Sequence, residues 1–160
     1  MMKEKGYTLI ECLVTIGLVV ILAALSMRGF VAAHDRMHEQ IVADEWRHRI
    51  TFARLMALNI GKPVTLCAST NGITCGGEWH EGQIIIADKE QEALLLAVFP
   101  PLPPKETLTF HAFPLSEHLT FQPWGVLKGQ NGTLTWRQRK KWGKVIEVIV
   151  SKSGRVRISH

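Results

Sequence analysis

Residues 6–27 read GYTLIECLVTIGLVVILAALSM. From residue 9 to residue 27 this stretch is almost wholly apolar. About 20 apolar residues cross a bilayer as a helix, and the run just reaches that length. Lys3 and Lys5 precede it and favour a cytoplasmic N-terminus, because basic flanking residues stay on the cytoplasmic side. The stretch therefore predicts a membrane-spanning helix, with the chain after Arg28 on the far side.

Glu11 is the acidic residue within that apolar run. An ionised carboxylate near the membrane is costly without a partner, so an acid in this position is a candidate functional residue. Its expected partner is a cation contributed by another chain. A cleaved secretory signal peptide is the competing interpretation. That interpretation requires a small-residue cleavage site after a short apolar region, and no good site of that kind follows here.

The residues after the apolar run predict a continuation of the same helix. Apolar side chains recur there at spacings of four and three, which is typical of one buried helix face. The face consists of Val42, Trp46, Ile50, Ala53, Ala57 and Ile60. The stretch Asn59-Ile60-Gly61-Lys62-Pro63 predicts the end, because glycine caps a helix and proline cannot continue one. We therefore expect one helix over residues 7–59, whose apolar second half needs a cover.

Short apolar or alternating runs fill the rest of the chain and predict β-strands. They lie at residues 64–67, 83–87, 94–99, 108–113, 119–123, 134–138, 145–150 and 156–159. Turn signals separate them, and the last three, Asn131-Gly132, Trp142-Gly143 and Ser153-Gly154, are close together. The C-terminal third should therefore be a meander of hairpins. The predicted fold class is α+β, with a long N-terminal helix packed against an antiparallel β-sheet domain.

Positive charge is concentrated at the C-terminal end. The chain has 160 residues and a formal net charge of +5. Between residues 137 and 157 it holds eight basic residues and one acid, Glu147, whereas the residues before them include 11 basic and 13 acidic ones. The eight basic residues are Arg137, Arg139, Lys140, Lys141, Lys144, Lys152, Arg155 and Arg157.

Two pairs of arginines in this region have a spacing of two residues. Such a pair on a strand points to one face, and planar guanidinium groups suit phosphate oxygens. The pairs are Arg155 with Arg157 and Arg137 with Arg139. Trp136 and Trp142 flank the second pair and are expected to stack on bases without reading their sequence. This surface would bind DNA through its backbone, with strong salt dependence. The alternative is a solvated hairpin whose charges aid solubility or meet acidic neighbours.

Cys67 and Cys75 are separated by the turn-rich residues Ala-Ser-Thr-Asn-Gly-Ile-Thr. A disulfide between them would close a short loop and would persist in an oxidising compartment such as a periplasm. Two unrelated thiols are the alternative. The third cysteine, Cys12, lies inside the apolar N-terminal run.

The spacing of the remaining polar residues predicts no catalytic site and no cofactor. His34 and His38 lie one helical turn apart, but structural zinc takes four ligands, so a solvated helix face is expected and no metal site is predicted. No arrangement of serine or cysteine with histidine is indicated, and no glycine-rich phosphate loop is present. We expect the chain not to be an enzyme.

The stretch Gly6-Tyr7-Thr8-Leu9-Ile10-Glu11, after a short basic leader, resembles the class III signal of type IV pilins and pseudopilins. The resemblance implies that a prepilin peptidase cuts after Gly6 and methylates Tyr7. It also implies that Glu11 neutralises the N-terminal amine of a neighbouring subunit. Tyr7 departs from the usual phenylalanine, and Cys12 follows the glutamate. The implied organisation is a leader at residues 1–6, a transmembrane and assembly helix at 7–28, and a soluble pilin domain at 29–160.

Further stretches resemble the GspH/FimT group of minor pilins and pseudopilins. They are Val64-Thr65-Leu66-Cys67-Ala68-Ser69 with Cys75, Trp79-x-x-Gly82 with Asp88, Phe121-x-Pro123-x-Gly125, and Gly132-Thr133-Leu134-Thr135. The tail Gly154-Arg155-Val156-Arg157 resembles the GRxR motif of FimT-type pilins that bind DNA during natural transformation. These resemblances imply a pilin-like fold and a DNA-binding role for the C-terminal hairpins.

Two functions follow from the resemblance. The first is a minor type IV pilin that binds DNA in natural transformation through Gly154 and the eight basic residues. The second is a structural minor pilin or pseudopilin without DNA binding, either GspH-like in type II secretion or FimU-like in pilus priming. In both, the expected partners are other pilins, the prepilin peptidase and the inner membrane. The C-terminal domain is expected in the periplasm before incorporation into a pilus or pseudopilus.

Overall fold

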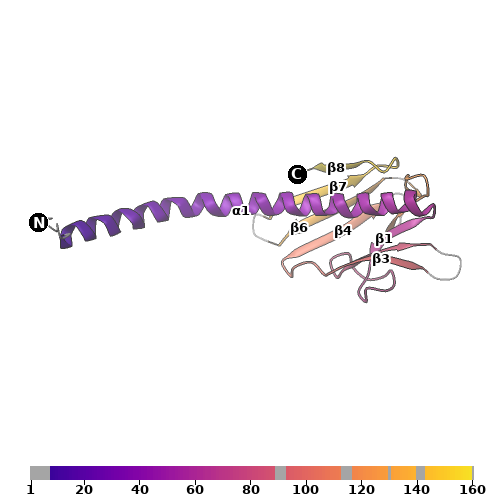
Figure 1. Ribbon diagram of the computed structural model, residues 1–160, viewed down its shortest axis with the longest axis horizontal. Helices are drawn as coiled ribbons and strands as arrows, with labels where there is room; N and C mark the ends of the chain where they lie inside the picture. Colours follow the sequence, from indigo (N-terminus) through magenta and orange to yellow (C-terminus); the bar gives the residue numbers. More distant parts are fainter. Residues whose placement is uncertain (1–7, 89–92, 113–116, 130, 140–142, 160) are drawn as a thin grey trace, which may run out of the picture. The chain divides into compact units, whose positions relative to one another are not determined.

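The computed structural model describes residues 8–88, 93–112, 117–129, 131–139 and 143–159, with the backbone alone at 25–28 and 31–32. One helix precedes eight strands (Figure 1). Two compact units are present, one up to Ile41 and one from Val42 to His160. The elements are α1 (Leu9–Ile60), β1 (Val64–Ala68), β2 (Gln83–Ala87), β3 (Leu94–Phe99), β4 (Glu106–Ala112), β5 (His118–Phe121), β6 (Gly132–Gln138), β7 (Val145–Val150) and β8 (Val156–Ser159).

The first unit contains the N-terminal part of α1. Thr8 caps this helix, because its hydroxyl accepts a hydrogen bond from the Glu11 amide at 3.4 Å. Glu11 occupies the first turn, where a carboxylate interacts favourably with the helix dipole. The large apolar side chains from Leu9 to Leu22 are 55–79% exposed. Over the part of the chain described, no helix has the length and mean hydropathy of a membrane span.

The second unit contains two four-stranded antiparallel sheets. The first sheet has the strand order β3-β2-β1-β5, and the second has the order β4-β6-β7-β8. The α+β class is confirmed, and each predicted strand has its counterpart in the structure. The division of the strands between two sheets is not predicted by the pattern. It arises because β5 pairs with β1, whereas β4 pairs with β6.

The C-terminal part of α1 lies across the strands of this unit (Figure 1). Its predicted apolar face is buried at Val42, Trp46, Ile50, Ala53 and Ala57, and Ile60 is half-buried. This face packs into one core with residues of both sheets, including Leu66, Leu134 and Trp136. Burial of a large apolar side chain contributes about 1.5–3 kcal/mol, so the helix face stabilises the core that the two sheets share.

Arg49 is a buried charge beside that apolar face. Its guanidinium lies over two aromatic rings, 4.7 Å from the Trp46 centroid and 4.3 Å from the Phe99 centroid. It donates hydrogen bonds to Gln83 and to Glu45. Cation–π contacts and an ion pair stabilise a guanidinium away from water, so Arg49 connects the helix to β2 and β3 of the first sheet.

Arg54, on the same helix, holds two glycine-containing turns together. Its Nε donates to the Gly125 carbonyl at 2.9 Å and its Nη1 donates to the Gly154 carbonyl at 3.4 Å. Gly154 is buried and has a φ of +78°. A Cβ on Gly154 would lie 2.7 Å from the Gly125 carbonyl oxygen. Glycine is therefore required at Gly154 both by the backbone conformation and by the close approach of the Gly125 loop.

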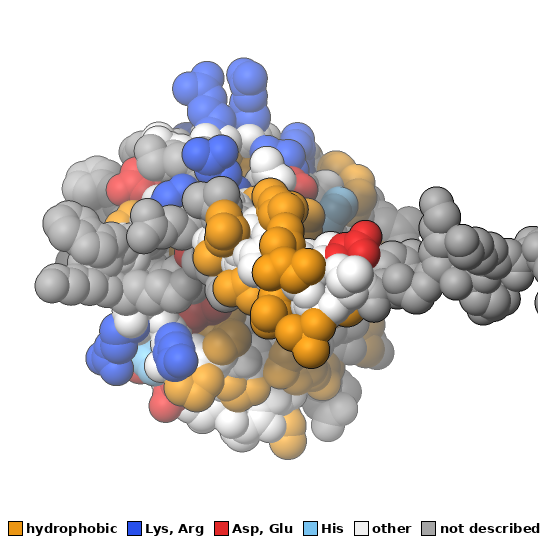
Figure 2. Space-filling model, turned by 90° about the vertical axis from the view of Figure 1, so that its left-hand side faces the viewer, with side chains coloured by type: hydrophobic (Ala, Val, Ile, Leu, Met, Phe, Trp, Pro, Cys, Tyr) orange, Lys and Arg blue, Asp and Glu red, His pale blue; other side chains and the backbone are white. Residues whose placement is uncertain are grey.

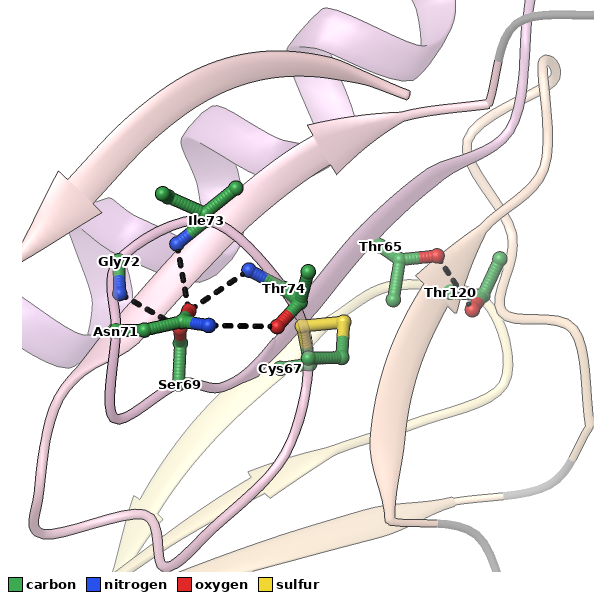
Figure 3. The surroundings of a disulfide bond; sticks show 9 residues. Thr65, Cys67, Ser69, Asn71, Gly72, Ile73, Thr74 and Thr120 are labelled. Carbon is green, nitrogen blue, oxygen red and sulfur yellow. Dashed lines mark hydrogen bonds between the residues drawn. A yellow bond between two sulfur atoms is a disulfide. The ribbon is translucent and has the colours of Figure 1, made fainter. Parts of the chain in front are cut away.

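A disulfide joins Cys67 of β1 to Cys75, with their Cα atoms 5.6 Å apart, as the sequence predicts (Figure 3). The loop that it closes is ordered by Asn71, whose Oδ1 accepts from the amides of Ile73 and Thr74, each at 2.9 Å. The side-chain Nδ2 of Asn71 also donates to the Thr74 hydroxyl at 2.9 Å. Local hydrogen bonds and the cross-link thus fix the same short segment.

Replacing Cys67 and Cys75 together by alanine should lower the free energy of unfolding by about 2–3 kcal/mol, because the cross-link restricts the unfolded chain. Urea denaturation of the full chain in a mild non-ionic detergent, followed by circular dichroism, measures the change. Reductant should shift the wild-type midpoint toward that of the double variant and leave the variant unchanged. A wild-type midpoint that does not respond to reductant would contradict the disulfide.

Gly154→Ala should destabilise the second unit more than Gly61→Ala. Both positions have a left-handed backbone, with φ of +78° and +67°, but only Gly154 has atoms within 4 Å of an added Cβ. The left-handed backbone costs about 1–2 kcal/mol in each variant. The overlap with the Gly125 carbonyl should add about 1–3 kcal/mol in Gly154→Ala alone. The same urea denaturation measures both variants, and equal losses would refute the close-approach role.

Candidate nucleic-acid interface

The turn between β7 and β8 presents the GRxR stretch. The Gly154 amide donates to the Ser151 carbonyl at 2.8 Å, and the Ser151 amide donates to the Arg155 carbonyl at 2.9 Å. The Ser151 hydroxyl also accepts from the Arg155 amide at 3.2 Å. Arg155 and Arg157 are exposed, and Val156 between them is half-buried. The two guanidinium groups therefore project from one face of a backbone that the turn holds in place.

Three segments converge around this turn: residues 54–62 at the end of α1, residues 122–131 after β5, and residues 151–155. Arg54 bonds to a carbonyl of each of the other two segments. The Leu127 amide donates to the Lys152 carbonyl, and the Lys152 amide donates to the Asn131 side chain, both at 2.9 Å. We call these three segments, together with Arg157, the Gly154 end.

The Gly154 end contains basic residues and no acidic one. Its basic residues are Arg54, Lys62, Lys128, Lys152, Arg155 and Arg157. Lys128, Lys152, Arg155 and Arg157 are exposed. A cluster of exposed positive charges creates an attractive potential for a polyanion, and this attraction is sensitive to salt. Asp88, whose amide donates to the Pro63 carbonyl, and Glu147 on β7 are the nearby acidic residues.

The other predicted basic residues lie at the opposite end of β7. Arg137 is on β6 opposite Val145, and Arg139 follows β6, with its amide bonded to the Lys105 carbonyl at 2.6 Å. Lys144 precedes β7, and Lys140, Lys141 and Trp142 lie outside the described residues. A strand of six residues places its two ends about 20 Å apart. The structure thus separates the predicted basic residues into two groups.

Exposed Lys and Arg side chains are visible on the face of the molecule that Figure 2 shows. The exposed basic members of the second group are Lys105, Arg137, Arg139 and Lys144. We call this second group the Arg137 end. A nucleic acid that contacts both ends must therefore extend along the sheet.

The stacking role predicted for Trp136 is wrong. Trp136 is 1% exposed, and its indole Nε1 donates to Glu106 Oε2 at 2.8 Å. The side chain belongs to the core because it has the same phase as Leu134 on β6, and both point toward α1. A buried indole presents no face to a base.

Among the described residues, Trp124 is an exposed tryptophan that the sequence pattern alone does not mark as a site residue. It is 66% exposed and belongs to the Gly154 end. Its signal was the neighbouring Pro123 and Gly125, which favour a tight turn whose central side chain points outward.

The predicted site residues near the N-terminus belong to a different part of the chain. Glu11 and Cys12 are exposed on the first turns of α1. Gly6 and Tyr7, the residues at the implied cleavage point, lie outside the described residues. The N-terminal and C-terminal candidates therefore belong to the two separate units.

Solved structures with a similar fold are minor pilins. The type IV minor pilin FimU of Pseudomonas aeruginosa (strain PAO1) has 21% identity and a TM-score of 0.59, over 78% of this chain and 90% of that one. The minor pseudopilin EpsH from the type 2 secretion system of Vibrio cholerae has 12% identity and a TM-score of 0.56, over 75% and 94%. At these identities the likeness shows the fold. No curated protein sequence matches the chain.

Two protein families match the sequence itself. Residues 1–27 match the prokaryotic N-terminal methylation motif. Residues 42–154, which include most of the second unit, match the family described as type II transport protein GspH. With a pilin-like α+β fold and a family match over more than half of its length, the chain belongs to the GspH family of minor pilins and pseudopilins.

Proposed function

We propose that this chain is a minor type IV pilin that binds the backbone of DNA during natural transformation. The observation that carries the proposal is the Gly154 end, where three segments supply exposed basic residues and no acid. Arg155 and Arg157 are the principal phosphate ligands, because guanidinium groups form paired hydrogen bonds with phosphate oxygens. Lys128 and Lys152 add charge beside them.

The Arg137 end extends this interface. Arg137 and Arg157 both belong to the outward-facing set of the second sheet, since each is exposed next to a more buried neighbour. DNA carries one charge per about 1.7 Å of duplex, so a site of about 20 Å along the sheet meets many phosphates. Contacts of this kind fix position and do not read base sequence.

The N-terminal unit supplies the means of assembly. Its exposed apolar side chains need a nonpolar environment, which a bilayer or the helices of other pilins would provide. We propose that residues 1–6 are removed by a prepilin peptidase, that Tyr7 is methylated, and that Glu11 binds the N-terminal amine of a neighbouring subunit. The chain is then a single-pass inner-membrane protein with its second unit in the periplasm, where the Cys67–Cys75 disulfide would persist.

A structural role without DNA is the second candidate. The likeness to FimU and EpsH supports it, because those proteins are described as a minor pilin and a minor pseudopilin. The exposed apolar residues of the N-terminal unit serve this role equally well. The two candidates differ in whether the Gly154 end binds a polyanion, so DNA binding discriminates between them.

Arg155→Gln with Arg157→Gln should weaken binding of a labelled 30-base-pair duplex by at least tenfold. Wild-type log K should fall with log salt at a slope of about −3 to −5, for about four to six phosphates. The double variant should have a slope shallower by about 2, because each lost phosphate contact removes about 1. Fluorescence anisotropy titrations of the full chain in non-ionic detergent, at several salt concentrations, measure both quantities.

Arg137→Gln with Arg139→Gln is the matched control, because it removes the same charge from the other end of the sheet. We expect a smaller loss of affinity than in the Arg155/Arg157 variant. Equal losses would mean that net charge alone decides binding. Wild-type affinity in the Arg155/Arg157 variant would exclude the GRxR stretch as the phosphate site.

Glu11→Gln should leave processing intact and prevent incorporation into pili. The substitution removes the negative charge that would pair with the N-terminal amine of a neighbouring subunit. It keeps the hydrogen bond from the backbone amide of residue 11 to the Thr8 hydroxyl. Mass spectrometry of the membrane-extracted protein should find a chain that starts at a methylated Tyr7 in both wild type and variant. Sheared pili should contain only the wild-type protein. A wild-type chain that retains Met1 would refute the leader assignment.

A further inference from the structure

Trp124 projects from a tight turn at the Gly154 end. The turn runs from Gln122 to Gly125 and is closed by the Gly125 amide, which donates to the Gln122 carbonyl at 2.8 Å. The Gln122 amide in turn donates to the Val126 carbonyl at 2.7 Å. Trp124 is 66% exposed in this turn. Trp46, Trp79 and Trp136 are buried, so the remaining described tryptophan stands out by its position on the surface.

The packing of two glycines brings the turn that carries Trp124 against the turn that carries Arg155. The Gly125 carbonyl oxygen lies so close to Gly154 that an added Cβ would be 2.7 Å away. Arg54 donates a hydrogen bond to the carbonyls of both glycines. Trp124 precedes one of these glycines, and Arg155 follows the other. The Trp124 indole and the Arg155 guanidinium therefore extend from neighbouring backbone segments that the Arg54 hydrogen bonds hold together.

Basic side chains continue from this pair on the same two segments. Lys128 follows Trp124 in the loop, and Lys152 lies in the opposing turn, where its carbonyl accepts from the Leu127 amide at 2.9 Å. Both lysines are exposed. An aromatic face next to a run of positive charges is the arrangement by which proteins bind single-stranded nucleic acid without sequence preference.

We infer that Trp124 stacks on an unpaired base while Arg155, Lys152 and Lys128 hold the adjoining phosphates, so that this surface binds single-stranded DNA more tightly than duplex. The inference rests on the proposed function of the Gly154 end. In a duplex the base faces are covered by their neighbours, so an indole gains stacking energy only from a base outside the stack. Phosphate contacts act on both forms of DNA.

An apolar protein partner is the competing occupant of this region. Leu55 and Leu58 are exposed on α1, and Leu58 lies near Gly125, since a Cβ on Gly125 would be 3.2 Å from Leu58 Cδ2. The absence of acidic residues from the three segments favours a polyanion over an apolar partner, because an apolar surface offers these positive charges no counter-charge. Nucleic acid is therefore the ligand that offers both a base for the Trp124 ring and phosphates for the basic side chains.

Trp124→Ala should lower the affinity for a single-stranded dT30 oligonucleotide by about tenfold, because a base on an aromatic ring contributes about 1–3 kcal/mol. Affinity for the 30-base-pair dA·dT duplex should change less than twofold. Trp124→Phe retains a ring and should stay within about threefold of wild type for dT30. Fluorescence anisotropy of the full chain in non-ionic detergent measures these affinities for the wild type and both variants.

Ile73→Ala is the matched control, because Ile73 is 70% exposed on the disulfide loop and outside the Gly154 end. It should leave both affinities unchanged. Tryptophan fluorescence gives an independent measurement that does not require an alanine variant. Addition of dT30 should quench wild-type emission more than that of Trp124→Phe, since a stacked base quenches an indole.

The outcomes separate this inference from the proposed function. Wild-type protein that binds neither DNA overturns both. Binding that is lost in the Arg155/Arg157 variant and unchanged in Trp124→Ala overturns the stacking role alone. Equal losses for dT30 and duplex in Trp124→Ala also overturn it. The stacking role is also overturned if Trp124→Ala binds dT30 like the wild type and associates more weakly with copurified pilins. That result would identify Trp124 as a protein-docking residue.

Discussion

The second unit depends on the burial of one face of α1 against both sheets. Val42, Trp46, Ile50, Ala53 and Ala57 lie in a single core with residues from the strands of each sheet. Over the residues that the structure describes, the two sheets share no ladder of backbone hydrogen bonds, so side-chain packing, with the apolar helix face at its centre, unites them. The loops at the ends of the sheets are positioned relative to this helix. Arg49 secures one side, between two aromatic rings and Gln83, and Arg54 secures the other.

The proposed DNA interface depends on the hydrogen bonds of Arg54. Arg54 is half-buried and gives its donors to backbone carbonyls, so its role is to hold Gly125 and Gly154 in place. In the proposed interface, the exposed residues on either side of these glycines have separate roles, Trp124 toward bases and Arg155 toward phosphates. This arrangement explains why a glycine occupies position 154 at the start of the GRxR stretch. A side chain at Gly154 would overlap the Gly125 carbonyl, which follows Trp124 in the chain.

The division of basic residues between two ends of β7 has a consequence for function. A small anion would occupy one end, whereas an extended polyanion can contact both. This favours DNA over a compact phosphate as the ligand of the second sheet. The role that we propose for the N-terminal unit is different, because its exposed apolar residues suit assembly with other helices. The residues proposed for attachment and those proposed for ligand binding thus belong to separate units of one chain.

The sequence by itself determined the helix, its buried face, the eight strands and the disulfide pair, because each depends on periodicity or local spacing that side-chain burial reproduces. It also determined the N-terminal motif, which family comparison supports. Tertiary structure decided which sheet each strand joins, since pairing partners such as β1 and β5 are distant in the chain. It decided that Trp136 is buried and Trp124 exposed, because the phase of a strand and the outward side of a turn depend on where the core lies. It also decided that basic residues within 21 positions of one another lie at opposite ends, because each strand of a hairpin carries the chain across the sheet.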